Sequence, residues 1–254
     1  MKKASLIIAT TWTFSVLLSS CGGSSNEVNT GKEGATSKEE IIIKLSENSK
    51  EVTIGKQVWM TENLNVSNFR NGDSIPQAKT NHEWQIAGEN QQPAWCYYNN
   101  DPANGEKYGK LYNGFAVNDS RGLAPLGWHI PSDSEWLTLL NNIGGKDLPS
   151  NKNYTLQSGN NIGGKELAGN KMKSTSGWEK NGNGTNEIGF SGFPGGYRDY
   201  PGVFECLGSG CNWWSSTVYS SDFAWYICLI NDGGGAYRYY MGLEGGFSVR
   251  CLKD

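Results

Sequence analysis

The sequence predicts an α+β domain. One segment, residues 133–143, has the apolar spacing and the start and stop signals of a helix. Beyond residue 174 the chain alternates glycine-rich loops with short aromatic and β-branched segments, which is typical of strands. Few helices, several short strands and long loops together indicate the α+β class.

The N-terminal half contributes strands and turns to this prediction. Residues 40–45 and 52–60 are rich in β-branched side chains, and we expect two strands separated by a polar turn. Residues 99–105 combine Asn, Asp, Pro and Gly, which predicts a turn. Residues 108–117 follow as an aromatic segment that we expect to be extended.

The helix over 133–143 is predicted from its first turn onward. Ser132 and Glu135 form a capping box, in which each side chain satisfies a backbone N–H of the other residue. Two glycines at 144 and 145 end the helix. A second helix is expected over residues 165–172. The apolar face of the first helix consists of Trp136, Leu139, Leu140 and Ile143.

The C-terminal third is predicted to supply most of the strands. In residues 223–230 large apolar side chains occupy both alternating sets of positions, so we expect both faces of this strand to be at least partly buried. The expected strands cover residues 189–193, 213–217, 223–230, 236–241 and 247–252.

The N-terminus resembles a bacterial lipoprotein signal. Two lysines precede a short apolar run, residues 4–18, and small residues precede Cys21. The run is too short to span a membrane and is typical of a secretory signal that is removed. The sequence before Cys21 resembles the lipobox, whose cysteine carries the acyl chains, so Cys21 is the expected lipidation site. An ordinary secretion signal is the alternative.

Three segments follow from this interpretation. Residues 1–20 are the expected signal peptide, residues 21–39 a polar, flexible tether, and residues 40–254 the folded domain. Acyl chains at one residue anchor a protein stably, because each buried methylene contributes about 0.8 kcal/mol. We therefore expect an exported protein of the cell envelope, an outer-membrane lipoprotein facing the periplasm or the cell surface, held to the membrane by its N-terminal lipid.

Charge and composition argue against nucleic acid as a partner. The formal net charge is -3, and the chain has no basic cluster denser than Lys171-Met172-Lys173. Its 34 glycines, 10 tryptophans and 12 tyrosines instead suit an exported fold with many turns and an aromatic core.

The five cysteines after Cys21 are the candidates for disulfides, which an exported location permits. Cys206 and Cys211 flank four small or flexible residues, and we expect them to pair; Cys96 with Cys251 is the preferred second pair, which leaves Cys228. The chain has no Cys-x-x-Cys spacing and only two histidines, so neither a metal site nor a cofactor is expected.

Six segments stand out in order along the chain: VTIGKQVWMTENL (52–64), WCYYNND (95–101), YGKLYN (108–113), GWHIPSD (127–133), WSST (214–217) and GFSVRC (246–251). Together they resemble the Fibrobacter succinogenes major paralogous domain. The resemblance covers about residues 50–254. Members of that family are typically exported proteins or lipoproteins of Bacteroidetes and Fibrobacteres without an assigned activity.

The same family is similar to the C-type-lectin-like superfamily. This similarity implies an α+β domain with short antiparallel strands, a paired N- and C-terminal strand, two helices and long loops rich in glycine and aromatic residues. A shared fold does not fix the function.

Glycan binding is the first functional interpretation, because exposed aromatic rings offer flat faces to the C–H surface of a sugar. The alternative is that these rings belong to the core, as is usual for aromatic residues in strands. Adjacent tyrosines at 239 and 240 must point to opposite faces of a strand, so one of them is the better candidate for exposure. The candidates are Trp213, Trp214, Tyr219, Tyr237, Tyr239 and Tyr240.

Calcium and enzymatic chemistry are less favoured. Residues 230–232 resemble one calcium-lectin strand motif, but the chain lacks the acid-Pro-Asn triplet of those lectins, and residues 99–106 break the EF-hand spacing. The spacing of Cys206 and Cys211 resembles the copper-binding cysteines of formylglycine-generating enzymes, although here the pair precedes Trp213. No catalytic residues are assigned.

We therefore expect a lipid-anchored, non-enzymatic binding or adhesion module for a glycan or a surface protein. The alternatives are a purely structural envelope lipoprotein and, less favoured, a cysteine-dependent oxidase of the formylglycine type.

Overall fold

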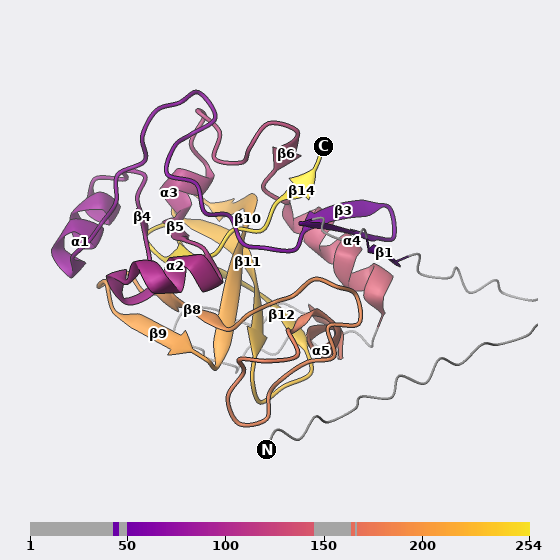
Figure 1. Cartoon of the computed structure of the whole chain (residues 1–254). Coiled ribbons are helices and arrows are strands. Elements are labelled where there is room, and N and C mark those ends of the chain that lie inside the picture. The colour runs from indigo at the N-terminus through magenta and orange to yellow at the C-terminus, as the bar shows by residue number, and fades with distance from the viewer. Residues whose placement is uncertain (1–42, 46–49, 145–163, 166) are drawn as a thin grey trace, which may run out of the picture. The chain divides into compact units, whose positions relative to one another are not determined.

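The computed structural model describes residues 43–45, 50–144, 164–165 and 167–254, and residues 40–254 form one compact unit. Figure 1 shows this unit with most of its elements labelled. The expected signal peptide, the tether and the lipidation site Cys21 lie outside the described residues. The unit combines α-helices with two β-sheets, which confirms the α+β class.

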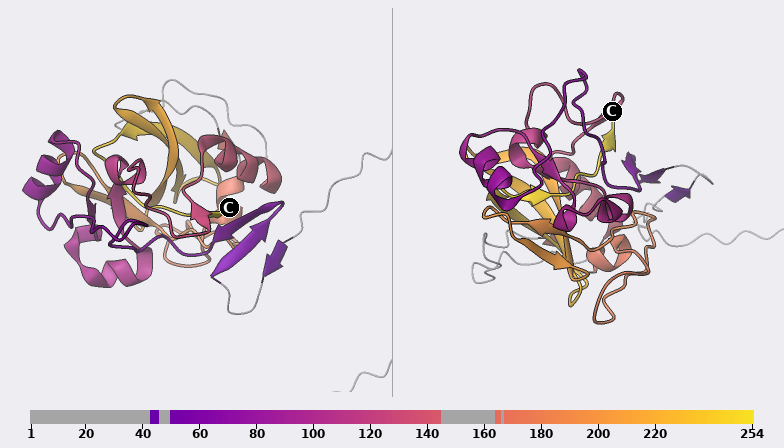
Figure 2. Two further views of the ribbon diagram at one scale, coloured as in Figure 1. Left: turned by 90° about the horizontal axis from the view of Figure 1, so that it is seen from above. Right: turned by 60° about the vertical axis from the view of Figure 1, so that its left-hand side comes forward.

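The first sheet joins the two ends of the domain. Its order is β1-β2-β3-β14-β6, with every pair antiparallel, so C-terminal β14 lies beside β3 (Figures 1 and 2). The strand predicted over 52–60 is in fact a hairpin, because Gly55 adopts a φ of +61° and turns the chain. The strands are β1 (Ile43–Leu45), β2 (Glu51–Ile54), β3 (Gln57–Met60), β6 (Trp128–His129) and β14 (Leu252–Lys253).

The second sheet has the order β4-β5-β13-β8-β10-β11-β12-β7, with β9 paired to β8. Its centre consists of three long antiparallel strands, β10 (Gly210–Ser220), β11 (Phe223–Ile230) and β12 (Ala236–Gly242). β11 has the predicted bounds and is buried on both faces. The shorter strands are β4 (Trp95–Cys96), β5 (Leu111–Asn113), β7 (Gly164–Lys165), β8 (Gly195–Arg198), β9 (Phe204–Leu207) and β13 (Gly246–Phe247).

Two strand predictions are wrong in detail. Residues 189–193 form no strand and contribute only a single bridge, from Gly192 to Lys173. The segment 247–252 is divided between β13 in the second sheet and β14 in the first. The residues between them cross from one sheet to the other, so one predicted strand serves two sheets.

Helix α4 (Asp133–Ile143) confirms the helix prediction at both ends. Ser132 and Glu135 form the capping box, and the chain leaves the helix at Gly144 with a φ of +77°. The four apolar residues predicted for its face are fully buried. The second predicted helix is shorter than expected: α5 covers Ala168–Met172 and is preceded by strand β7.

Three further α-helices in the described part of the chain were not predicted. α1 (Asn81–Glu89) has its own capping box from Thr80 and Glu83, and α3 (Gly114–Val117) is a single turn capped by Asn113. α2 (Pro102–Tyr108) replaces the turn expected over 99–105, because Asp101 caps the helix and Pro102 occupies its first turn. As a result, the extended segment expected over 108–117 is limited to β5.

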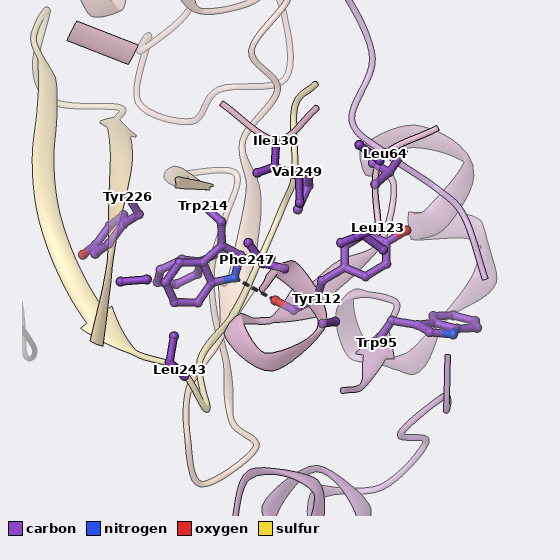
Figure 3. Packing of buried hydrophobic residues seen from close by; sticks show 14 of the residues in the cluster. Leu64, Trp95, Tyr112, Leu123, Ile130, Trp214, Tyr226, Leu243, Phe247 and Val249 are labelled. Carbon is purple, nitrogen blue, oxygen red and sulfur yellow. Dashed lines mark hydrogen bonds between the residues drawn. The ribbon is translucent and has the colours of Figure 1, made fainter. Parts of the chain in front are cut away.

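The core lies on both faces of β10, β11 and β12. On one face, Trp214, Tyr226 and Tyr239 are cross-strand neighbours and pack against Phe247, as Figure 3 shows for Trp214, Tyr226 and Phe247. On the other face, Trp213 and Ile227 pack against α4. Two adjacent tryptophans on β10 therefore anchor two separate clusters, as the alternation of a strand requires.

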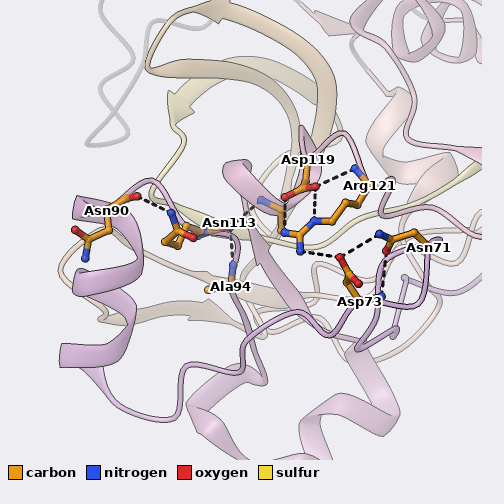
Figure 4. A network of polar contacts seen from close by, with 9 residues as sticks. Asn71, Asp73, Asn90, Ala94, Asn113, Asp119 and Arg121 are labelled. Atoms are coloured by element: carbon orange, nitrogen blue, oxygen red, sulfur yellow. Dashed lines mark hydrogen bonds and ion pairs between the residues drawn. The ribbon is translucent and has the colours of Figure 1, made fainter.

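A polar network holds the loops that border this core. Arg121 donates two hydrogen bonds of 2.9 and 2.8 Å to Asp119 and reaches Asp73 at 3.3 Å (Figure 4). Its guanidinium also lies 4.2 Å from the centroid of the Phe69 ring. The pKa of Asp119 is lowered, chiefly by its hydrogen bond with Arg121. Loops distant in sequence are thus joined by one arginine.

The structure contains neither expected disulfide, since all five cysteines of its described part carry free thiols. Cys211 is buried in the cluster with α4, whereas Cys206 is exposed on β9. Cys96 packs in a third, smaller cluster beneath α1, and Cys251 packs in the cluster of Trp214. Each expected pair is thus divided between different environments.

Candidate ligand-binding surface

The candidate site lies where the long strands extend beyond helix α4. On β11 the exposed fraction rises along one face from 1% at Ile227 to 9% at Trp225 and 38% at Phe223. Asp133, the first residue of α4, accepts hydrogen bonds of 2.6 and 2.7 Å from Arg238 on β12. This ion pair marks the end of the part of the sheet that α4 covers.

Four aromatic side chains, which we call the aromatic patch, occupy this uncovered end. Tyr219 and Tyr240 stack in parallel, with 4.2 Å between ring centroids and an interplanar angle of 7°. Trp225 meets both tyrosine rings edge to face, and Phe223 meets Tyr240 in the same way. The patch consists of Tyr219, Phe223, Trp225 and Tyr240.

The aromatic patch is held in place on the side that faces Arg238 and is accessible to solvent on the other side. The Arg238 guanidinium lies 3.6 Å from the Trp225 ring centroid and is fixed by Asp133, so the buried side of the patch has little freedom. On the outer side Tyr219 is 50% exposed. Residues 221 and 222 form the turn between β10 and β11, and both are exposed; the Ser221 hydroxyl donates a hydrogen bond of 2.9 Å to Asp222 Oδ2.

Three of the six predicted ligand-binding residues lie in the core, which corrects the sequence interpretation. Trp213 and Trp214 are fully buried, and Tyr239 is 2% exposed. The indole nitrogens of the two tryptophans donate to Asn63 Oδ1 and to the Tyr112 carbonyl oxygen, both at 2.8 Å; Figure 3 shows the bond of Trp214. Their rings have no face left for a ligand.

The other three predicted residues are divided between the two faces of the sheet. Tyr219 and Tyr240 meet in the aromatic patch, as a ligand site requires. Tyr237 lies partly buried on the opposite face and packs against the core cluster that contains Tyr239, with 6.3 Å between their ring centroids. The structure therefore brings together two of the six.

Three residues of this surface were missed in the sequence. Phe223 and Trp225 were assigned to a strand buried on both faces, and Arg238 drew no attention because its partner Asp133 is 105 residues away. The available signal was the cluster of aromatic residues at 219, 223, 225 and 240, which the hairpin register of β10, β11 and β12 brings to one end.

Two of the segments that carry the family resemblance, residues 52–64 and 246–251, meet inside the domain and not at this surface. Asn63 Oδ1 accepts from Arg250 Nε at 3.0 Å, from Arg250 Nη2 at 2.8 Å and from Trp213 Nε1 at 2.8 Å. Arg250 is 1% exposed, and it also donates to the carbonyl oxygens of Met60 and Phe190. These residues hold the two sheets together, which is a structural role.

A histidine between two carboxylates is the other notable polar group. His129 contacts Asp254 Oδ1 through Nδ1 at 2.8 Å and Glu135 Oε1 through Nε2 at 3.0 Å. Burial lowers the pKa of His129, but its hydrogen bonds with both carboxylates outweigh this effect and raise it. Glu135 Oε2 also accepts hydrogen bonds from the backbone N–H and the hydroxyl of Ser132, the residue that caps α4. The group therefore joins β6, α4 and the residue that follows β14.

Within the described ranges, no group of three or more His, Cys, Asp or Glu side chains is arranged to hold a metal ion. Among the helices that the structure describes, none has the length and apolar character needed to cross a membrane.

Comparison with known proteins gives one match. Residues 52–253 match the model of the family described as the Fibrobacter succinogenes major domain. No curated protein matches the chain, and no solved structure does.

Proposed function

The chain belongs to the Fibrobacter succinogenes major domain family, and from that premise we propose that it is an exported, lipid-anchored module that binds a glycan through its aromatic patch without performing chemistry. The proposal combines the lipoprotein-like N-terminus, with Cys21 as the acylated residue, with the accessible rings at the end of the second sheet. The protein would act in the cell envelope, attached to the outer membrane.

The stacked pair Tyr219 and Tyr240 is the observation that carries this proposal. Two aromatic rings held 4.2 Å apart, with the outer one half-exposed, present a fixed flat apolar face. Such a face suits the C–H side of a pyranose ring, while Ser221 and Asp222 in the adjoining turn offer groups for its hydroxyls. The rings are already ordered, so binding loses little side-chain entropy.

A C-type-lectin-like fold is part of the proposal. Its support is the pairing of N-terminal β3 with C-terminal β14, and a second sheet that carries long connections. The calcium-binding triplet of the calcium-dependent lectins is absent from the sequence. The proposed recognition therefore depends on ring stacking and hydrogen bonds, and chelation should not affect it.

A glycan array probed with the full chain tests the proposal. Tyr219→Ala should lower the affinity for any bound glycan about tenfold, equivalent to about 1.4 kcal/mol, because it removes the outer stacking ring. Tyr200→Ala is the matched control, since Tyr200 is 43% exposed on the turn after β8 and lies outside the patch. EDTA should leave binding unchanged.

Two outcomes would contradict the proposal. If no glycan binds, the structural-lipoprotein alternative gains support; if glycans bind equally to wild type and Tyr219→Ala, the ligand site lies elsewhere. If the chain instead binds a surface protein and Tyr219→Ala abolishes that binding, the aromatic patch is still the binding site, but its ligand is a protein and not a glycan.

A further inference from the structure

Cys206 occupies an unusual position at the edge of the second sheet. It lies on β9, its φ of +61° is in the left-handed region, and it is exposed to solvent. β9 ends at Leu207, and Gly208 and Ser209 then turn the chain into β10, which begins at Gly210. The Cβ of Cys206 lies 3.3 Å from the place where a Cβ on Gly210 would stand, so Cys206 fills the space that this glycine leaves.

Cys228 lies on the same side of the sheet. Gly210 is opposite Ile230 and Asn212 is opposite Cys228, so these four positions share one face by strand alternation. Cys206 lies over Gly210, and Gly210 is diagonal to Cys228 on this face, because its partner Ile230 is two residues further along β11. The Cys228 thiol is in contact with the Leu229 carbonyl oxygen, at 3.7 Å.

Cys211, the expected partner of Cys206, is directed elsewhere. Its side chain is buried in the cluster of Trp213 and Leu229, on the face that α4 covers, while Cys228 belongs to the cluster of Trp214 on the opposite face. A bond from Cys206 to Cys211 would have to pass through the backbone layer of β10. A disulfide needs its two Cβ atoms on one side and about 3.5–4.5 Å apart.

We propose that Cys206 and Cys228 form a thiol–disulfide pair, with a low-molecular-weight disulfide as its oxidant. The Cys206 thiolate attacks the small disulfide, forms a mixed disulfide and releases one small thiolate. Cys228 then loses its proton, attacks the Cys206 sulfur and releases the second small thiolate. The two protein thiols are oxidised to one disulfide, and the small disulfide is reduced to two thiols.

The surroundings determine the order of the two steps. Cys206 is exposed, so it meets the reagent first; burial raises the pKa of its thiol, while the hydrogen bond with Ser209 lowers it. Burial raises the pKa of Cys228 more strongly, and the negative charge of a Cys206 thiolate adds to that effect. Forming the mixed disulfide removes this charge, which favours ionisation of Cys228 for the second step. Both steps should accelerate above neutral pH.

Closure would join the outer edge of the sheet to its central strand. The bond would link β9 to β11 across the turn that enters β10 and enclose residues 206–228. A bond of this kind lowers the entropy of the unfolded chain, so the oxidised protein should have the higher Tm. The inference is independent of glycan binding, because the aromatic patch lies at the other end of β11.

Peptide mapping after oxidation tests the pair. The full chain is incubated with oxidised glutathione near pH 8.5, alkylated, and digested with chymotrypsin, which cleaves after Leu207 and after the aromatic residues between Cys211 and Cys228. We expect a peptide containing Cys206 linked to one containing Cys228, and a Tm several degrees above that of the reduced chain. Cys228→Ala should stop at the glutathione adduct on Cys206, and Cys206→Ser should give no linkage between residues 206 and 228.

Cys96→Ala is the matched control, since it removes a buried thiol in a different cluster and should leave the linkage intact. A linkage of Cys206 to Cys211 would overturn the proposal, as would a stable glutathione adduct on the wild-type chain without any internal bond. The absence of any reaction at Cys206 would overturn it equally. The wild-type map decides among these outcomes even if a variant fails to fold.

Discussion

Removing the Asn63 side chain should destabilise the domain severely. Its Oδ1 accepts three hydrogen bonds from buried donors, two of Arg250 and one of Trp213, and its Nδ2 donates to the Tyr108 carbonyl oxygen at 2.8 Å and to Ser248 Oγ at 3.2 Å. No carboxylate hydrogen-bonds the guanidinium of Arg250 within the described residues, so Asn63 is its main side-chain acceptor. Asn63→Ala leaves a buried charge without that acceptor.

The size of the effect follows from the groups that lose partners. A hydrogen bond to a charged group contributes about 1.5–3 kcal/mol, and an unsatisfied buried N–H such as that of Trp213 costs about 1–3 kcal/mol. The carbonyl oxygens of Met60 and Phe190 still solvate the guanidinium, which limits the loss. We expect Asn63→Ala to lower the free energy of unfolding by about 3–5 kcal/mol, as for a buried charge that loses its partner.

Urea denaturation followed by tryptophan fluorescence measures this change. Asn65→Ala is the matched control, because Asn65 is exposed two residues along the same segment and its side chain donates one hydrogen bond, to the Gly105 carbonyl oxygen; the substitution should cost less than about 1 kcal/mol. Asn63→Asp keeps the acceptor and should cost about half as much as alanine. A loss below about 1.5 kcal/mol for Asn63→Ala would refute the role assigned to this hydrogen-bond hub.

Three further predictions concern the core, the histidine and the anchor. Trp136→Ala should lower the free energy of unfolding by about 3–5 kcal/mol, because the indole is fully buried against Trp59 and Trp213; a change below about 1 kcal/mol in denaturation would contradict its core position. The pKa of His129 in the folded state is raised above 6.5, so the stability it contributes is complete below that value and is lost as the pH rises through the folded pKa. This gain is below about 1 kcal/mol because the pair is partly exposed. His129→Gln should reduce the fall in Tm as the pH rises from about 5 to 8, and an unchanged slope would contradict this role of His129. Alkyne-palmitate should label the wild-type chain and spare Cys21→Ala; equal labelling of both would disprove the anchor.

The prediction of α4 succeeded because its signals are local. The capping pair Ser132 and Glu135, the apolar spacing and the terminal glycine all lie within thirteen residues, and each favours a helix. α1 carries a similar local signal in Thr80 and Glu83, but its weaker apolar face, with only Trp84 and Gly88 buried, left it unrecognised. A helix was thus predicted only where a capping pair and a periodic apolar face occur together.

The turn predicted over 99–105 failed for the opposite reason. Asp101, Pro102 and Gly105 are common turn residues, but Asp and Pro are equally common at the start of a helix. Gly105 allows α2 to lie against Tyr97, whose ring would be 2.1 Å from a Cβ at this position. This glycine is a packing requirement from a residue outside the helix, which the local sequence cannot reveal.

The aromatic patch shows why exposure is harder to predict than structure. Alternation established that Tyr239 and Tyr240 lie on opposite faces, and the structure confirms this: Tyr239 packs in the core and Tyr240 in the patch. Which of the two is accessible depends on the length of α4 relative to the strands it covers. Because α4 begins at Asp133 and Arg238 joins it there, no helix of the described part of the chain lies over the strand residues beyond that ion pair. The accessibility of this end of the strands is therefore set by where α4 begins, which the sequence of neither strand specifies.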